Sequence, residues 1–61
     1  MKTKKNIYQL EFEARKTDLA QTEKDDLMLE VVCSPTKHLY YFRYSKEGRK
    51  RLSRADFIKE L

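Results

Sequence analysis

The stretch His38–Leu61, HLYYFRYSKEGRKRLSRADFIKEL, decides the fold that the sequence predicts. Its first part, residues 39–44, is rich in aromatic residues that favour β-strands. Side chains alternate between the two faces of a strand, so we expect every second aromatic to pack inward: Tyr40, Phe42 and Tyr44. Tyr41 and Arg43 then point outward from the same strand.

The end of this stretch predicts a short helix over residues 54–61. Ser53 has the hydroxyl of a good N-cap, and Asp56 follows it at the third helical position. Leu52 and Phe57 occupy the positions of a hydrophobic staple. A helix this short is not stable alone, so its apolar stripe must press against a sheet. That stripe consists of Phe57, Ile58 and Leu61.

Working outward, residues 7–15 alternate between apolar and polar side chains and therefore predict a first strand. Its expected inward residues are Tyr8, Leu10, Phe12 and Ala14. Residues 16–26 are polar, and we expect a loop there, with a turn of helix begun by Thr17 or Asp18 as the alternative. Residues 27–33 predict a second strand, whose expected inward residues are Leu27, Leu29 and Val31.

Two turns connect the remaining elements. Ser34-Pro35-Thr36-Lys37 joins the second strand to the aromatic strand as a hairpin, because proline pre-sets the backbone for such a turn. Residues 45–48 form the next turn, in which Gly48 can adopt a positive φ. Residues 49–52 extend the sheet if they form a fourth short strand.

The expected fold is therefore α+β: a small antiparallel meander of three or four strands with one C-terminal helix packed on one face. Residues 7–61 form a single domain, preceded by a flexible basic arm over residues 1–6. We expect one core in which four residues meet: Phe12, Leu29, Phe42 and Phe57. The second face would be apolar and would favour a homodimer; its residues are Ile7, Met28, Val32, Leu39 and Tyr41.

Composition narrows the class of protein. The chain has 61 residues with one Cys, one His and one Gly, and it contains no nucleophile elbow or phosphate-binding loop. We therefore expect neither an enzyme nor a protein with a cofactor or small-molecule substrate. Cys33 and His38 fall short of the four ligands of a zinc site, so no metal is expected. The lone cysteine and the lack of a long apolar run predict a soluble cytoplasmic protein without membrane contact.

Charge is segregated along the chain. Residues 37–54 contain seven basic side chains and one acidic one, a net charge of +6, whereas residues 17–36 carry −4. Clustered positive charge attracts polyanions such as nucleic acids. Stacking on Tyr41 would add affinity for unpaired bases. The predicted nucleic-acid contacts are Tyr41, Arg43, Lys46, Arg49, Lys50, Arg51 and Arg54.

The run from Leu39 to Leu61 resembles the positive-cofactor-four family of single-stranded-DNA-binding transcriptional coactivators. The matching pieces are Tyr41-Phe42-Arg43-Tyr44, Glu47-Gly48-Arg49-Lys50, Leu52-Ser53 and Phe57. The resemblance implies a β-sheet platform, dimerisation, and transcription regulation through single-strand binding by basic and aromatic side chains. A looser likeness links the chain to the three-strand-plus-helix DNA-binding domains of phage-type integrases.

The alternative interpretation is a protein-interaction module. An apolar sheet face or an exposed edge strand would let such a module dock on another protein. A phage or mobile-element accessory factor that inhibits a host protein is one example. The acidic segment 17–36 favours this alternative, because a dedicated DNA-binding protein gains little from it.

Overall fold

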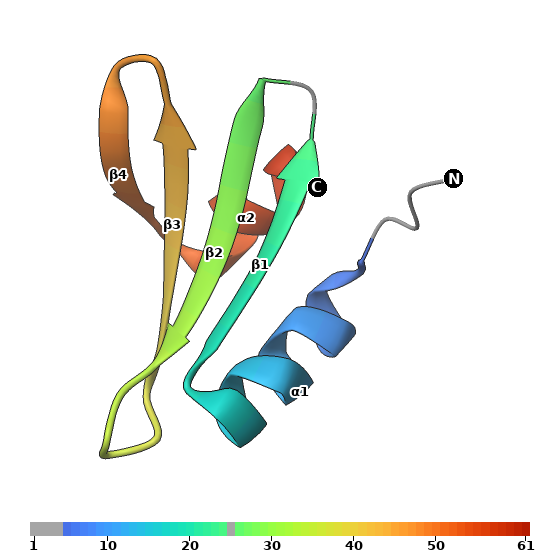
Figure 1. The fold of residues 1–61 in the computed structure, drawn as a ribbon, viewed down its shortest axis with the longest axis vertical. Helices are drawn as coiled ribbons and strands as arrows, with labels where there is room; N and C mark the ends of the chain where they lie inside the picture. Colours follow the sequence, from blue (N-terminus) through green and yellow to red (C-terminus); the bar gives the residue numbers. More distant parts are fainter. Residues whose placement is uncertain (1–4, 25) are drawn as a thin grey trace.

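The computed structural model describes residues 5–24 and 26–61, which form an α+β fold (Figure 1). Most of the predicted basic arm, residues 1–4, lies outside the described residues, as does Asp25 of the predicted loop. The chain forms helix α1 (Ile7–Thr17), strands β1 (Leu19–Lys24), β2 (Leu27–Cys33), β3 (Leu39–Ser45) and β4 (Gly48–Leu52), and helix α2 (Arg54–Glu60). The strands make one antiparallel sheet in the order β1-β2-β3-β4. The α+β class and the antiparallel meander are confirmed, but the described residues form two helices rather than one.

The segment predicted as the first strand is the helix α1. Its buried residues recur at helical spacing: Ile7, Leu10, Glu11 and Ala14. Asn6 and Gln9 close a capping box, in which the Gln9 N–H donates to Asn6 Oδ1 (2.8 Å) and the Asn6 N–H donates to Gln9 Oε1 (2.9 Å). Tyr8 and Phe12, predicted to point inward, are 73% and 60% exposed.

The predicted loop over residues 16–26 contains the strand β1. Asp18 ends α1 in the left-handed conformation (φ 72°), and its N–H donates to the Ala14 carbonyl. β1 then pairs with β2 from Leu19 opposite Val32 to Lys24 opposite Leu27. The backbone hydrogen bonds of this ladder outweigh the polar composition that predicted a loop.

The hairpin between β2 and β3 reverses the predicted facing of β3. The Lys37 N–H donates to the Ser34 carbonyl, and Lys37 has a positive φ of 70°. The Ser34 N–H then donates to the His38 carbonyl, so the loop holds an extra residue and Cys33 pairs with Leu39. A turn limited to residues 34–37 would instead have paired Cys33 with His38. A shift of one residue moves every side chain of a strand to the other face.

Lys37 offers a test of this hairpin. A side chain costs about 1 kcal/mol in the left-handed region, and glycine avoids that cost. We expect Lys37→Gly to raise the free energy of unfolding by about 0.5–1 kcal/mol in urea titrations. Lys46→Gly is the matched control, because Lys46 lies in the next turn and does not have a positive φ. Glycine at this position should therefore lower the free energy of unfolding. An equal decrease in the free energy of unfolding in both variants would contradict the left-handed conformation of Lys37.

Both helices pack on the same face of the sheet. α1 contacts β1 and β2, and α2 contacts β3 and β4. In Figure 1, α2 follows β4 and runs behind the sheet. The core between the helices and the sheet comprises Ile7, Leu10, Ala14, Ala20, Leu29, Val31, Cys33, Tyr41 and Phe57. Leu29 and Phe57 are in this core as predicted. Phe12 lies on the outside of α1 and Phe42 on the other sheet face, so the predicted quartet is wrong.

The helix α2 begins as predicted. Ser53 is its N-cap, and the Ser53 hydroxyl accepts a hydrogen bond from the Asp56 N–H (3.2 Å). Phe57 is fully buried with its ring centroid 5.2 Å from that of Tyr41. Ile58, however, is 40% exposed, so Phe57 is the main anchor of the helix. Among residues 5–24 and 26–61, no helix is long and apolar enough to cross a membrane.

Candidate nucleic-acid interface

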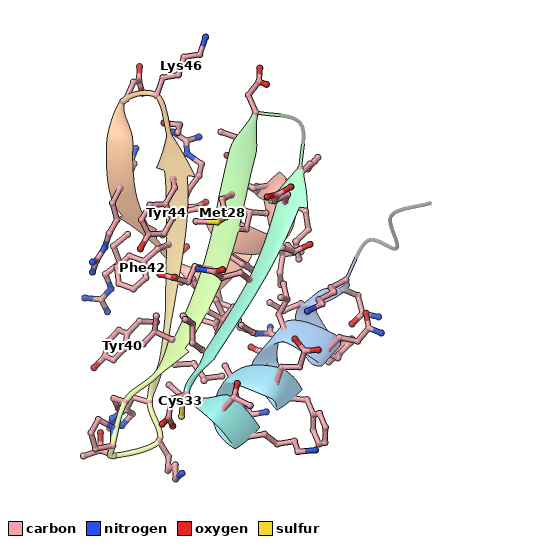
Figure 2. The ribbon with its side chains drawn as sticks, viewed as in Figure 1. Met28, Cys33, Tyr40, Phe42, Tyr44 and Lys46 are labelled. Atoms are coloured by element: carbon pink, nitrogen blue, oxygen red, sulfur yellow. The ribbon has the colours of Figure 1, made fainter. Side chains whose placement is uncertain are left out.

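The face of the sheet opposite the helices is formed by side chains from all four strands. We call it the open face. β1 and β2 contribute Leu19, Gln21, Glu23, Met28, Glu30 and Val32, and β3 and β4 contribute Tyr40, Phe42, Tyr44, Arg49 and Arg51. Figure 2 labels the three aromatic residues along β3, with Met28 beside Tyr44. Aromatic rings thus run along the middle of this face, with arginines on its β4 side.

Two arginines of β4 lie over aromatic rings of β3. The guanidinium carbon of Arg49 is 4.0 Å from the Phe42 ring centroid, and that of Arg51 is 4.8 Å from the Tyr40 ring centroid. Each arginine therefore makes a cation–π contact. Phe42 is only 9% exposed even though it lies on the open face. The outer surface at this point is the flat guanidinium itself.

A carboxylate lies in the centre of the open face. Glu30 is 8% exposed and accepts two hydrogen bonds, from the Tyr44 hydroxyl to Oε1 (2.7 Å) and from the Gln21 amide to Oε2 (2.8 Å). The hydrogen bond to Glu30, followed by burial, raises the pKa of Tyr44 above its usual value. Three strands therefore hold one network of side chains in a fixed geometry.

Three of the seven predicted contact residues belong to this side of the molecule. Arg49 and Arg51 lie on the open face, and Lys46 is exposed in the turn between β3 and β4 (Figure 2). All three remain available to an approaching polyanion. The sequence predicted them from charge alone, and the structure adds that two of them lie over rings.

Tyr41, predicted to stack on bases, lies on the helix side of the sheet. It is 8% exposed, and its hydroxyl donates a hydrogen bond to the Glu11 carboxylate on α1. Arg54, another predicted contact, donates from Nε to the same carboxylate (2.8 Å). The predicted outward position of Tyr41 is therefore wrong. These three residues instead connect α1, β3 and α2.

The ionisation of this connection follows from its surroundings. Burial alone would raise the pKa of Glu11, but the hydrogen bonds from Arg54 and Tyr41 together lower it below its usual value. Burial and the hydrogen bond to Glu11 raise the pKa of Tyr41 to about 12. The contact with Glu11 also raises the pKa of Arg54. The network is therefore stable as a carboxylate, a neutral phenol and a guanidinium.

The last two predicted contacts also lie on the helix side. Arg43 pairs with Glu60 of α2 (3.2 Å), and its buried Nε has no hydrogen-bond partner among the described residues. Lys50 lies opposite Arg43 on β4 and is exposed. The side chains of both residues therefore belong to the face opposite the open face. The continuous basic segment in the sequence is therefore divided between two faces.

Nine of the eleven open-face residues were not predicted as contacts, and five of these form the aromatic row and the network around Glu30: Gln21, Glu30, Tyr40, Phe42 and Tyr44. The three aromatics were assigned to the core, and no role was predicted for Gln21 or Glu30. No local signal in the sequence identifies them, because the register of the β2–β3 hairpin sets the face that each residue shows. Leu29 and Val31 are clearly inward, and their partners Arg43 and Tyr41 must share that face.

The apolar second face predicted for a homodimer also differs from the observed one. Met28 and Val32 lie on the open face as expected. Ile7, Leu39 and Tyr41 belong to the core or pack against it on the helix side. The open face is consequently more aromatic and more cationic than the predicted apolar surface.

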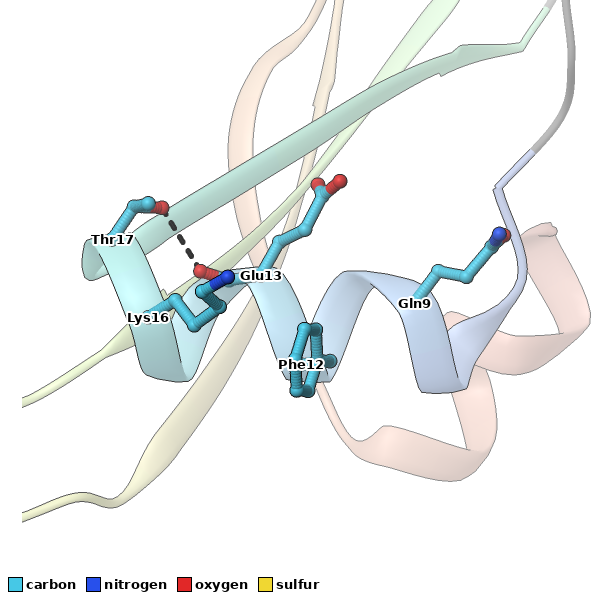
Figure 3. Close-up of a pocket in the computed structure, with 5 residues that line it drawn as sticks. All are labelled: Gln9, Phe12, Glu13, Lys16 and Thr17. Carbon is cyan, nitrogen blue, oxygen red and sulfur yellow. Dashed lines mark hydrogen bonds between the residues drawn. The ribbon is translucent and has the colours of Figure 1, made fainter.

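A second exposed surface lies on the outside of α1. A hollow of about 520 Å³ is lined by Gln9, Phe12, Glu13, Lys16 and Thr17. Figure 3 shows the Phe12 ring beside it, and the Lys16 ammonium lies 5.3 Å from that ring centroid. Tyr8 lies one helical turn before Phe12 and is even more exposed. This pair of aromatics is a candidate for contact with another protein.

Comparison with known proteins gives no relative. No protein-family model matches the chain, and no curated protein or solved structure is detectably similar to it. Within the described part of the chain, no group of three or more His, Cys, Asp or Glu residues is placed to hold a metal ion.

Proposed function

We propose that this protein binds nucleic acid on the open face and acts as a small regulatory protein of transcription or of a related process. The observation that carries the proposal is the pairing of Arg49 with Phe42 and of Arg51 with Tyr40. Guanidinium groups bind phosphates and also stack on bases, so this surface fits both parts of a nucleotide. Lys46 extends the positive charge along the same hairpin.

Single strands fit this face better than duplex does. The face is a row of rings and flat guanidinium groups, which can contact bases only where those bases are unstacked. Tyr40 and Phe42 are two residues apart on β3, about 7 Å by strand geometry. An extended strand can therefore place successive bases over the two guanidinium groups that lie on these rings.

Charge reversal of the open face tests the proposal. We expect Arg49→Glu with Arg51→Glu to weaken binding of a labelled single-stranded oligonucleotide at least tenfold at low salt. Lys50→Glu with Lys59→Glu is the matched control, because it changes the net charge equally but leaves the open face intact. The measurement is fluorescence anisotropy at two salt concentrations, with thermal melts to verify folding.

The parent protein should also lose affinity steeply as salt rises, since each neutralised phosphate releases counterions. Tyr40→Ala should weaken single strands by about 1–3 kcal/mol and duplex much less. Equal losses of affinity in the open-face and control double variants would show that binding depends on net charge and not on the open face. Salt-independent binding, or none at low ionic strength, would disprove the proposed function.

The alternative function is a protein-interaction module, and the exposed pair on α1 favours it. Tyr8 and Phe12 are 73% and 60% exposed, an unusual use of aromatic residues on a helix surface. In the simplest form of this alternative, Tyr8 and Phe12 of two copies of the chain form the interface of a homodimer. We expect Tyr8→Ser with Phe12→Ser to shift such a dimer to monomer in sedimentation equilibrium without lowering the melting temperature. A monomeric parent protein at high concentration would exclude the homodimer.

A further inference from the structure

We propose that the network around Glu30 selects guanine among the bases that reach the open face. This inference rests on the proposed function and assigns its base preference. Glu30 is directly opposite Phe42 across the β2–β3 ladder, and Phe42 lies beneath Arg49. A base stacked over that arginine extends across one strand spacing, about 4.8 Å, and its edge then lies over Glu30.

Glu30 offers hydrogen-bond acceptors to such a base. Tyr44 uses its only hydroxyl hydrogen on Oε1, and Gln21 holds Oε2 from the other side. Each carboxylate oxygen retains a further lone pair. The partners that hold Glu30 are the phenol of Tyr44 and the side-chain amide of Gln21, and neither brings a positive charge to the carboxylate. The small exposed part of Glu30 belongs to the open face, because the helices pack on the other face.

The acceptor geometry determines which base fits. A carboxylate repels phosphate, so the backbone of the strand must follow Arg49 and Arg51 while a base lies over Glu30. Guanine presents two adjacent donors, N1–H and the 2-amino group, that match the two oxygens of one carboxylate. Cytosine and adenine present a single amino group, and thymine or uracil presents one N–H between two carbonyl oxygens that the carboxylate repels.

The test uses an oligo-dT strand with one central position varied. We expect guanine at that position to bind about tenfold tighter than thymine, and inosine, which lacks the 2-amino group, to lose most of that gain. Glu30→Gln should abolish the preference for guanine while it strengthens binding to the all-thymine strand, because a negative charge is removed. Glu47→Gln is the control, since it removes a negative charge from the exposed β3–β4 turn but should keep the preference.

The outcomes separate the two proposals. Equal affinity for all strands, or a guanine preference that survives in Glu30→Gln, overturns the role of Glu30 and leaves the proposed function intact. Absence of binding to any strand overturns both. Thermal melts of Glu30→Gln confirm that the sheet is still folded, and Tyr44→Phe provides a second variant that loosens the carboxylate without changing charge. Tyr44→Phe should weaken the guanine preference severalfold and leave the affinity for oligo-dT near that of the parent.

Discussion

Phe57→Ala is expected to unfold most of the protein at room temperature. The ring is fully buried, contacts Tyr41 and anchors α2 to the sheet. Loss of a buried phenylalanine costs about 3–5 kcal/mol, because apolar contacts disappear and a cavity remains. A chain of this length has about that much stability in total. Circular dichroism during urea titration measures the loss.

Ile58→Ala is the matched control, since Ile58 is the next residue of the same helix and is 40% exposed. It should cost under about 1 kcal/mol and retain a cooperative transition. If Phe57→Ala melts within a few degrees of the parent protein, α2 does not contribute to the core as the structure describes.

Glu11→Ala is expected to cost about 2 kcal/mol, although it removes a charged residue from a buried position. The Tyr41 hydroxyl would lose its acceptor inside the core, and an unsatisfied buried donor costs about 1–3 kcal/mol. Arg54 would lose its ion pair, but water can hydrate its guanidinium group, which is partly exposed. Chemical denaturation of the variant and the parent protein gives the difference.

A double-mutant cycle with Tyr41→Phe isolates the contact. Tyr41→Phe alone should destabilise the parent protein by about 1 kcal/mol. In the Glu11→Ala background it should be neutral or stabilising, because the phenol there is an unsatisfied group. Additive losses in the double variant would show that Tyr41 and Glu11 do not interact.

The same contact gives the stability a pH dependence. The folded-state pKa of Glu11 is lowered, so its contribution is present above pH ~4.5 and is lost as pH falls through the lowered value. The folded-state pKa of Tyr41 is raised to about 12, so its contribution is present below pH ~10 and is lost as pH rises toward 12. The alkaline loss in the free energy of unfolding should amount to at most about 2–3 kcal/mol and should be smaller in Glu11→Ala.

Local signals in the sequence located β2, β3, β4 and α2 but misassigned α1 as a strand and β1 as a loop. The β2–β3 hairpin, the Gly48 turn, the Ser53 cap and the helix after it were all predictable from local residues. Residues 7–15 fit two periods equally well, because an apolar residue occurs at both two-residue and helical intervals. The capping box of Asn6 and Gln9 was the signal that favoured the helix.

The candidate site was harder to predict, because it depends on which face each strand shows. The sequence identified a basic hairpin correctly. It did not reveal the β2–β3 loop that pairs Cys33 with Leu39, in which Lys37 adopts a positive φ. The register set by this loop decides whether Tyr40 or Tyr41 reaches the open face. Contacts between distant segments, such as that of Glu11 with Tyr41, have no local signature at all.

The arginines over Phe42 and Tyr40 have a consequence for the protein without its ligand. An open sheet that displays bare rings is attractive to other unfolded or partly folded chains. Arg49 and Arg51 cover those rings with charged groups that water hydrates and that repel a second copy of the same surface. The side chains proposed to meet a ligand therefore also protect the sheet from aggregation while that ligand is absent.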